Sequence, residues 1–272
     1  MSATTFTLTL PTAREPCFDE SLADAPLAGY AKSDSKPVST PFGGKLLWVG
    51  NATCIIEFNG IRFMTDPNFL HQGTHFRLRE GETLSLLWRR HAGDHVHLAP
   101  GVTAERIKDP AFDYKQCPAV DFIRMLLSSP STAKANRSPY AVLSHLHEDH
   151  FDNLVAEHIR KSLPIISTTH ACSNLGTRSH TVLYPLDTWQ SVRVTKGTEE
   201  LTITSMPGKH TLGVTDSVNS VLHLIPPVMG SMIAFKKPGA EKDYNLYISG
   251  DTLYYDELKV SERLLVRCTR VF

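Results

Sequence analysis

The stretch Leu143-Ser144-His145-Leu146-His147-Glu148-Asp149-His150-Phe151-Asp152 decides the fold of this chain. It overlaps a short apolar run, residues 141–143, which predicts a buried strand that ends in a loop of metal-binding side chains. Because alternate residues of an extended chain face the same side, His145 and His147 can bind one ion. Asp149 and His150 follow where the chain bends toward a helix, and they can bind a second ion nearby. The stretch therefore predicts a two-metal site.

The types of side chain in this stretch indicate which ions it would bind. Neutral imidazole nitrogen and carboxylate oxygen suit zinc and iron, and they do not form the closed thiolate shell of a structural zinc site. Such a site leaves a coordination position open for water. The alternative is a polar loop with a chance run of histidines, which the preceding strand, the spacing and the following helix together disfavour.

The pattern His-x-His-x-Asp-His resembles the signature of the metallo-β-lactamase fold superfamily of metal-dependent hydrolases. Residues 45–69, including Thr65-Asp66-Pro67, resemble the opening strands of the branch with N-acyl-phosphatidylethanolamine phospholipase D and ascorbate-6-phosphate lactonase. Pro207-Gly208-Lys209-His210 and Ile248-Ser249-Gly250-Asp251-Thr252 resemble its later metal motifs. The resemblance covers residues 45–258 and implies an α/β fold of the αββα sandwich type.

The resemblance also implies a complete ligand set. His210 would join His145 and His147 at the first metal, Asp149 and His150 would bind the second metal, and Asp251 would bridge the two ions. Zinc is the expected metal, with two ions in a complete site and manganese or iron as alternatives. Asp149 is the candidate catalytic residue, since it can also accept a proton from the attacking water. Asp66 is either an acid that orients a ligand histidine from beneath the site or a turn-capping residue before Pro67.

The reaction implied by such a site is hydrolysis, in which a metal-bound water attacks an ester, a lactone or a phosphodiester. A small-molecule substrate, with or without an anionic group, is expected. Four arginines between the opening strands and the histidine motif either meet such an anion or are simply solvated. They are Arg77, Arg79, Arg89 and Arg90.

Two departures from the family pattern favour another function. The family's second metal site ends with a further histidine after the bridging aspartate, and here no histidine follows His223. Residues 263–272 do not resemble the family's continuation, so the sandwich is expected to be incomplete at its C-terminal end. The composition of residues 122–139 predicts a loop insertion. It is either a surface loop or a segment that ordinary members of the family lack. The alternative function is a catalytically degenerate metal-binding protein or a truncated, nonproductive form.

Composition limits the remaining possibilities. With 272 residues, 41% of them hydrophobic, the chain can bury a large core. It has zero formal net charge and no long apolar run, so neither a nucleic-acid partner nor a membrane span is expected. Its five cysteines lack paired spacing, which favours a reducing, cytoplasmic compartment. The sequence does not indicate an oligomeric state.

Two regions are expected along the chain. Residues 1–41, rich in Ser, Thr, Ala and Pro, predict a flexible N-terminal arm in which alternating Phe6, Leu8 and Leu10 can form an edge strand. Residues 42–272 predict the hydrolase domain, with a hairpin turn at Asn59-Gly60 and a helix capped by Asp152 that runs to about residue 161. Further strands are expected at 165–169, 182–184, 191–194, 201–206, 220–224, 231–235 and 245–249, with a helix around 171–176.

Overall fold

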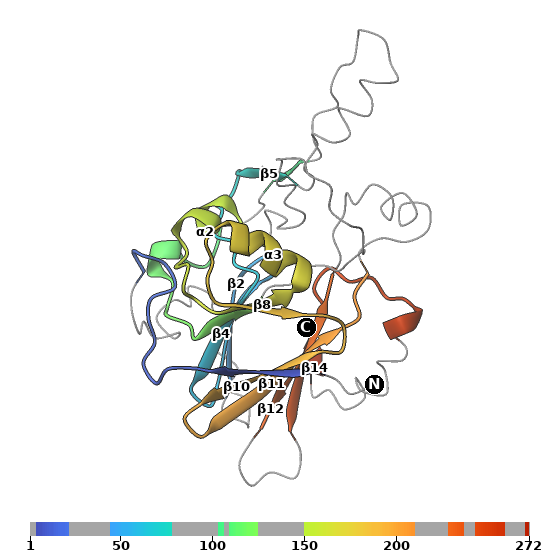
Figure 1. Cartoon of the computed structure of the whole chain (residues 1–272). Coiled ribbons are helices and arrows are strands. Elements are labelled where there is room, and N and C mark those ends of the chain that lie inside the picture. The colour runs from blue at the N-terminus through green and yellow to red at the C-terminus, as the bar shows by residue number, and fades with distance from the viewer. Residues whose placement is uncertain are drawn as a thin grey trace.

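The computed structural model describes residues 4–21, 44–77, 103–105, 109–124, 150–209, 228–236, 243–258 and 270–271. These residues form a mixed α/β fold with two large sheets (Figure 1). The first sheet has the spatial order β1 (Thr5–Thr9), β10 (Ser191–Lys196), β11 (Glu199–Met206), β12 (Gly230–Phe235), β13 (Tyr244–Ile248) and β14 (Arg270–Val271). The second has the order β2 (Lys45–Gly50), β3 (Thr53–Phe58), β4 (Ile61–Thr65), β7 (Phe122–Arg124), β8 (Ile165–Thr168) and β9 (Leu183–Leu186). A small separate sheet pairs β5 (His75–Arg77) with β6 (Thr103–Glu105).

An apolar core joins the two large sheets. Phe63 of β4 and Phe122 of β7 stack with their ring centroids 5.1 Å apart, and Phe235 of β12 lies 6.5 Å from Phe63. All three rings are buried, and they belong to one cluster with aliphatic side chains from both sheets. Removing this apolar surface from water supplies the main force that holds the sheets together.

A second core lies on the other face of the second sheet. The helices α2 (Asn153–His158) and α3 (Thr169–Thr177) lie over this face in Figure 1. They pack Val155, Ala171 and Leu175 against sheet residues such as Ile123 and Ile165. The short 3₁₀ helix η2 (Tyr114–Gln116) contributes Tyr114 to the same cluster. The α/β class expected from the sequence is therefore confirmed for the described residues.

The strand predictions for the second half of the chain are largely confirmed, with small shifts of their bounds. β8 to β13 occupy six of the seven predicted segments, and α3 covers the helix predicted around 171–176. The Asn59-Gly60 turn joins β3 to β4 with φ of 47° and 76°, as expected for a tight hairpin. The predicted strands at 141–143 and 220–224 lie outside the described residues.

The centre of the second sheet corrects one expectation. Residues 122–124, at the start of the predicted loop insertion, form β7, which pairs in parallel with both β4 and β8. Phe122 and Ile123 are fully buried on opposite faces of the sheet, which explains why this segment is held as a central strand. The rest of the predicted insertion, 125–139, lies outside the described residues.

The edge strand expected near the N-terminus is confirmed, but the described residues around it differ from the predicted flexible arm. Thr5–Thr9 forms the edge strand β1, which pairs in parallel with β10, and Leu8 and Leu10 are buried in the core between the sheets. Farther along, Cys17 and Phe18 are fully buried in the core beneath the helices. Residues 4–21 are therefore packed, because their apolar side chains enter both cores. Residues 22–41 of the predicted arm lie outside the described residues.

Helix α2 is shorter than predicted. The Asp152 side chain caps its first turn, as expected, by accepting the Val155 N–H at 2.8 Å. The helix ends at His158 because Ile159 adopts an extended conformation and forms an antiparallel bridge with Phe18. The N-terminal segment thus sets the end of this helix.

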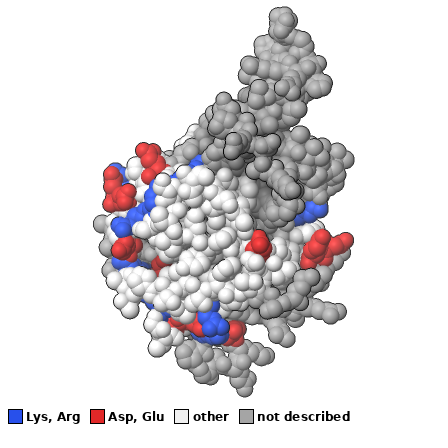
Figure 2. Space-filling view, in the orientation of Figure 1, with Lys and Arg blue, Asp and Glu red and all other residues white. Residues whose placement is uncertain are grey.

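Charged side chains of both signs are mixed over the described part of the face in Figure 2, and the surface over α3 is mostly uncharged. Among the described residues, no helix is long and apolar enough to cross a membrane.

Candidate metal centre

Two of the six predicted metal ligands, His150 and Asp251, lie within the described residues. His150 precedes α2, and Asp251 follows β13. His150 belongs to the first predicted metal motif along the chain, and Asp251 belongs to the last. The other four predicted ligands lie outside the described residues. They are His145, His147, Asp149 and His210.

His150 and Asp251 meet although 101 positions separate them along the chain. The His150 Nε2 atom lies 3.2 Å from Asp251 Oδ2, within hydrogen-bonding distance. The His150 side chain is 7% exposed and that of Asp251 is 38% exposed, so the pair lies at the boundary between the core and the surface. The fold therefore brings a buried imidazole and an accessible carboxylate to one point.

Asp66 lies on the inner side of this pair, directly after β4. Its Oδ1 atom is 3.9 Å from His150 Nδ1, and its side chain is fully buried. At 3.9 Å this contact is a charge interaction when His150 is protonated, and it is longer than a hydrogen bond. The structure thus places Asp66 beneath the predicted ligand His150, where it can influence the orientation of the ring.

The backbone of Asp66 is held in an unusual conformation. Its φ is +36°, in the left-handed region that residues other than glycine seldom adopt. Thr53 Oγ1 donates to the Asp66 carbonyl oxygen at 2.6 Å, and the Asp66 N–H donates to the Arg124 carbonyl at 3.3 Å. These two contacts compensate for the strain, and such strain in a buried acidic residue is typical of functional sites.

Arg124 is a charged group at this end of the molecule that the sequence interpretation did not single out. It is fully buried at the end of β7, where Nε donates to Ser231 Oγ at 2.6 Å and Nη2 donates to the Met229 carbonyl at 3.3 Å. Burial lowers the pKa of Arg124 to about 10, although the charge of Asp66 raises it. The guanidinium is therefore still a cation at neutral pH, and it offsets part of the negative charge of Asp66. No local sequence signal indicates this burial, which depends on contacts between distant strands.

The loops that carry the two later metal motifs are fixed to each other. The Lys209 N–H donates to Thr252 Oγ1 at 2.7 Å, and the Leu253 N–H donates to the Lys209 carbonyl at 2.7 Å. Lys209 immediately precedes the predicted ligand His210, and Thr252 immediately follows Asp251. The backbone next to one predicted ligand is thus held beside the backbone next to another.

Gly208 allows this approach. A Cβ atom at this position would lie 1.8 Å from the Val228 carbonyl oxygen, far inside van der Waals contact. Only glycine fits here without displacing the Val228 backbone.

His71 also lies near two carboxylates, those of Asp109 and Asp113, each at 3.4 Å, but its side chain is 55% exposed. Three other described histidines belong to other parts of the fold. His158 stacks on Tyr114 with ring centroids 5.0 Å apart, and His170 lies in α3. His180 is buried, and burial together with the charges of Lys161 and Arg178 lowers its pKa to about 4. These surroundings differ from those of His150, which faces two carboxylates.

The distance between His150 and Asp251 can be compared with the spacing of two ligands around a metal ion. Two ligands at the usual zinc distances and tetrahedral angle lie about 3.4 Å apart. The 3.2 Å between His150 Nε2 and Asp251 Oδ2 is close to this value. Imidazole and carboxylate donors also suit zinc or iron. Among the described residues, no group of three or more histidine, cysteine or acidic side chains is arranged to hold a metal ion. The pair therefore fits part of a coordination shell.

The fold is similar to solved structures of hydrolases. Isothiocyanate hydrolase from gut bacteria of Delia radicum superposes with a TM-score of 0.51 at 16% identity, over 80% of this chain and 67% of that one. A possible metal-dependent hydrolase from Veillonella parvula superposes with a TM-score of 0.51 at 16% identity, over 81% of this chain and 68% of that one. No family model matches the sequence, and no curated protein matches it. At this identity the likeness shows a shared fold.

Proposed function

We propose that the protein is a metal-dependent hydrolase of the metallo-β-lactamase type, with an αββα sandwich and a metal centre near His150 and Asp251. The observation that carries the proposal is the convergence of these two side chains, 101 positions apart, above the buried Asp66. The fold shared with hydrolase structures supports it.

The proposed ligand set has six members. His145, His147 and His210 would hold one ion, Asp149 and His150 would hold the other, and Asp251 would contribute its carboxylate to both. Zinc is the proposed ion, with manganese or iron as alternatives. When bound, the metal supplies Lewis acidity and lowers the pKa of a coordinated water toward neutrality.

Residues of the chain would accept a proton and hold the metal ligands in position. Asp149 accepts the proton that leaves the attacking water. Asp66, held by Thr53 and Arg124, keeps the His150 ring oriented toward Asp251. The hydrogen bond from the Lys209 N–H to Thr252 Oγ1 holds the loop that carries Asp251 in place. The bond cleaved is proposed to be an ester, a lactone or a phosphodiester in a small molecule, in the cytoplasm.

The experiment is a hydrolysis screen on the zinc-loaded chain with esters, lactones, phosphodiesters and an isothiocyanate. We expect turnover of at least one class, and we expect Asp149→Ala and Asp251→Asn to abolish it without unfolding the protein. Glu157→Ala is the matched control, because this side chain is 74% exposed on α2 and should leave turnover unchanged. Unchanged turnover in Asp149→Ala would remove Asp149 from the mechanism.

A second function is metal binding without catalysis. It is favoured by the buried Arg124 cation, whose charge interacts with that of Asp66 and disfavours a second cation there. Tight metal binding with no turnover across the whole screen would identify this function.

A further inference from the structure

The N-terminal residues 4–21, which we call the N-terminal strap, contact both layers of the fold. In Figure 1 the blue chain runs along the first sheet as β1 and continues toward the helices. At its far end the Arg160 N–H donates to the Cys17 carbonyl at 2.9 Å, and Phe18 bridges to Ile159. The strap therefore connects the first sheet to the end of α2.

Charged contacts hold the middle of the strap. Arg14 Nε lies 3.2 Å from Asp121 Oδ2, and Asp121 also accepts from Lys196 Nζ at 2.7 Å. The Asp121 side chain is 1% exposed, so these contacts lie in a poorly solvated setting. They place the following residues of the strap next to the segment that leads into β7.

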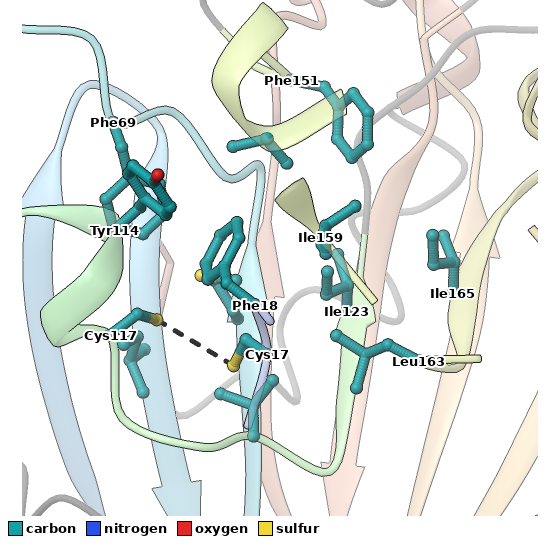
Figure 3. Packing of buried hydrophobic residues seen from close by; sticks show 14 of the residues in the cluster. Cys17, Phe18, Phe69, Tyr114, Cys117, Ile123, Phe151, Ile159, Leu163 and Ile165 are labelled. Atoms are coloured by element: carbon teal, nitrogen blue, oxygen red, sulfur yellow. Dashed lines mark hydrogen bonds between the residues drawn. The ribbon is translucent and has the colours of Figure 1, made fainter. Parts of the chain in front are cut away.

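At the end of the strap, two cysteine thiols meet in the core. The sulfur atoms of Cys17 and Cys117 are 3.9 Å apart, and both residues are fully buried (Figure 3). Both thiols also lie near one acceptor, the Pro118 carbonyl oxygen, at 3.2 Å from Cys17 Sγ and 3.5 Å from Cys117 Sγ. The sulfurs would have to approach by about 1.9 Å to reach the length of a disulfide bond.

The surroundings shield this pair from solvent. Phe18, next to Cys17 in the chain, packs edge-on against Phe69 and Tyr114, and this aromatic cluster lies to one side of the pair in Figure 3. Burial raises the pKa of Cys117 well above the usual thiol value, and the neighbouring Cys17 raises it further. The thiolate is the reactive form, and burial disfavours it. Because both sulfurs are buried, an oxidant reaches the pair only when the strap opens locally.

We propose that Cys17 and Cys117 are a disulfide-forming site, which locks the N-terminal strap onto the core when the protein meets a peroxide. One thiol loses its proton, and the thiolate attacks a peroxide oxygen, which breaks the O–O bond and gives a sulfenic acid and hydroxide. The hydroxide takes up the released proton and becomes water. The second thiol then attacks the sulfenic sulfur, forms the S–S bond and releases a second water. The two sulfurs together lose two electrons and two protons, and hydrogen peroxide is reduced to two molecules of water.

The bond would join residues 100 positions apart. A cross-link that closes so long a loop removes many conformations from the unfolded chain, and its stabilising effect grows with the loop length. It would also prevent the strap from separating from the core without global unfolding. The proposed site is independent of the metal centre, since neither cysteine is a predicted ligand.

The test uses the full chain without any variant. The protein is treated with hydrogen peroxide under native conditions, its remaining thiols are alkylated, and it is digested without reduction for peptide mapping by mass spectrometry. We expect one cross-linked peptide pair that joins Cys17 to Cys117 and is lighter by two hydrogens than the sum of its parts. We also expect a rise in melting temperature of about 5–10 °C that dithiothreitol reverses.

Matched variants separate this pair from other thiols. Cys172→Ala removes another buried cysteine, in α3, and should leave both the cross-link and the thermal shift intact. Cys17→Ala should lose both. The proposal is overturned if the oxidised, folded wild-type protein yields Cys17 and Cys117 separately alkylated or overoxidised. Pairing of either residue with a different cysteine also overturns it.

Discussion

The substitution Asp152→Ala tests how the segment after the predicted metal ligands is held against the rest of the fold. The Asp152 carboxylate is fully buried, and it caps α2 through the Val155 N–H. Its other oxygen accepts the N–H of Phe69, in the loop after β4. This one side chain therefore connects the segment that follows the predicted ligands to the segment that follows Asp66.

The expected loss in the free energy of unfolding follows from these two contacts. Loss of the helix cap costs about 1 kcal/mol. The buried Phe69 N–H would lose its acceptor, which adds about 1–3 kcal/mol. We therefore expect Asp152→Ala to lower the free energy of unfolding by about 3 kcal/mol. Asp152→Asn keeps one side-chain oxygen as an acceptor, and it should lose roughly half as much.

The assay is urea unfolding monitored by circular dichroism, with chelator present so that metal binding does not contribute. The slope with urea should stay unchanged while the midpoint falls. Glu157→Ala, on the exposed side of the same helix, should stay within about 0.5 kcal/mol of wild type. An Asp152→Ala variant that unfolds at the wild-type midpoint would refute this account of the capping contact.

Two further predictions concern pH and backbone packing. The folded pKa of His180 is about 4 and its ordinary value is 6.5, so the unfolded chain binds more protons between these values. Unfolding free energy measured in urea should therefore fall as pH decreases from 6.5 to about 4, and His180→Gln should flatten that dependence. Gly208→Ala should cost about 3 kcal/mol, because its Cβ meets the Val228 carbonyl at 1.8 Å. The matched change is Gly176→Ala in α3, where the added Cβ would lie 3.8 Å from Leu183 Cδ1, an ordinary van der Waals contact. It should be neutral or stabilising by about 0.5–1 kcal/mol in the same urea assay.

Local signals in the sequence predicted much of the fold. The Asn59-Gly60 turn and the Asp152 cap could be predicted because short-range chemistry determines both. β7 could not be predicted, since it has only three residues and one of them is the charged Arg124. Recognising it requires the partner strands β4 and β8, which the sequence pattern does not reveal.

The sequence motifs pointed to two side chains that the structure brings together, and most of the surroundings of this pair were not predicted. His150 and Asp251 were found from motifs, and the structure brings them within 3.2 Å. Neither the left-handed backbone of Asp66 nor the buried charge of Arg124 has a local sequence signal, because both depend on contacts between distant strands. The packing of Cys17 beneath the helices was missed for the same reason.

The most direct test of the central claim is the metal content of the purified chain. The protein is dialysed against zinc, freed of loosely bound ions and measured by elemental analysis, beside His150→Ala, Asp251→Ala and the control Glu157→Ala. The account predicts at least one zinc per chain in the wild type and the control, with a clear loss in both ligand variants. Wild-type protein without zinc, or ligand variants that keep the full wild-type content, would contradict a metal centre at His150 and Asp251.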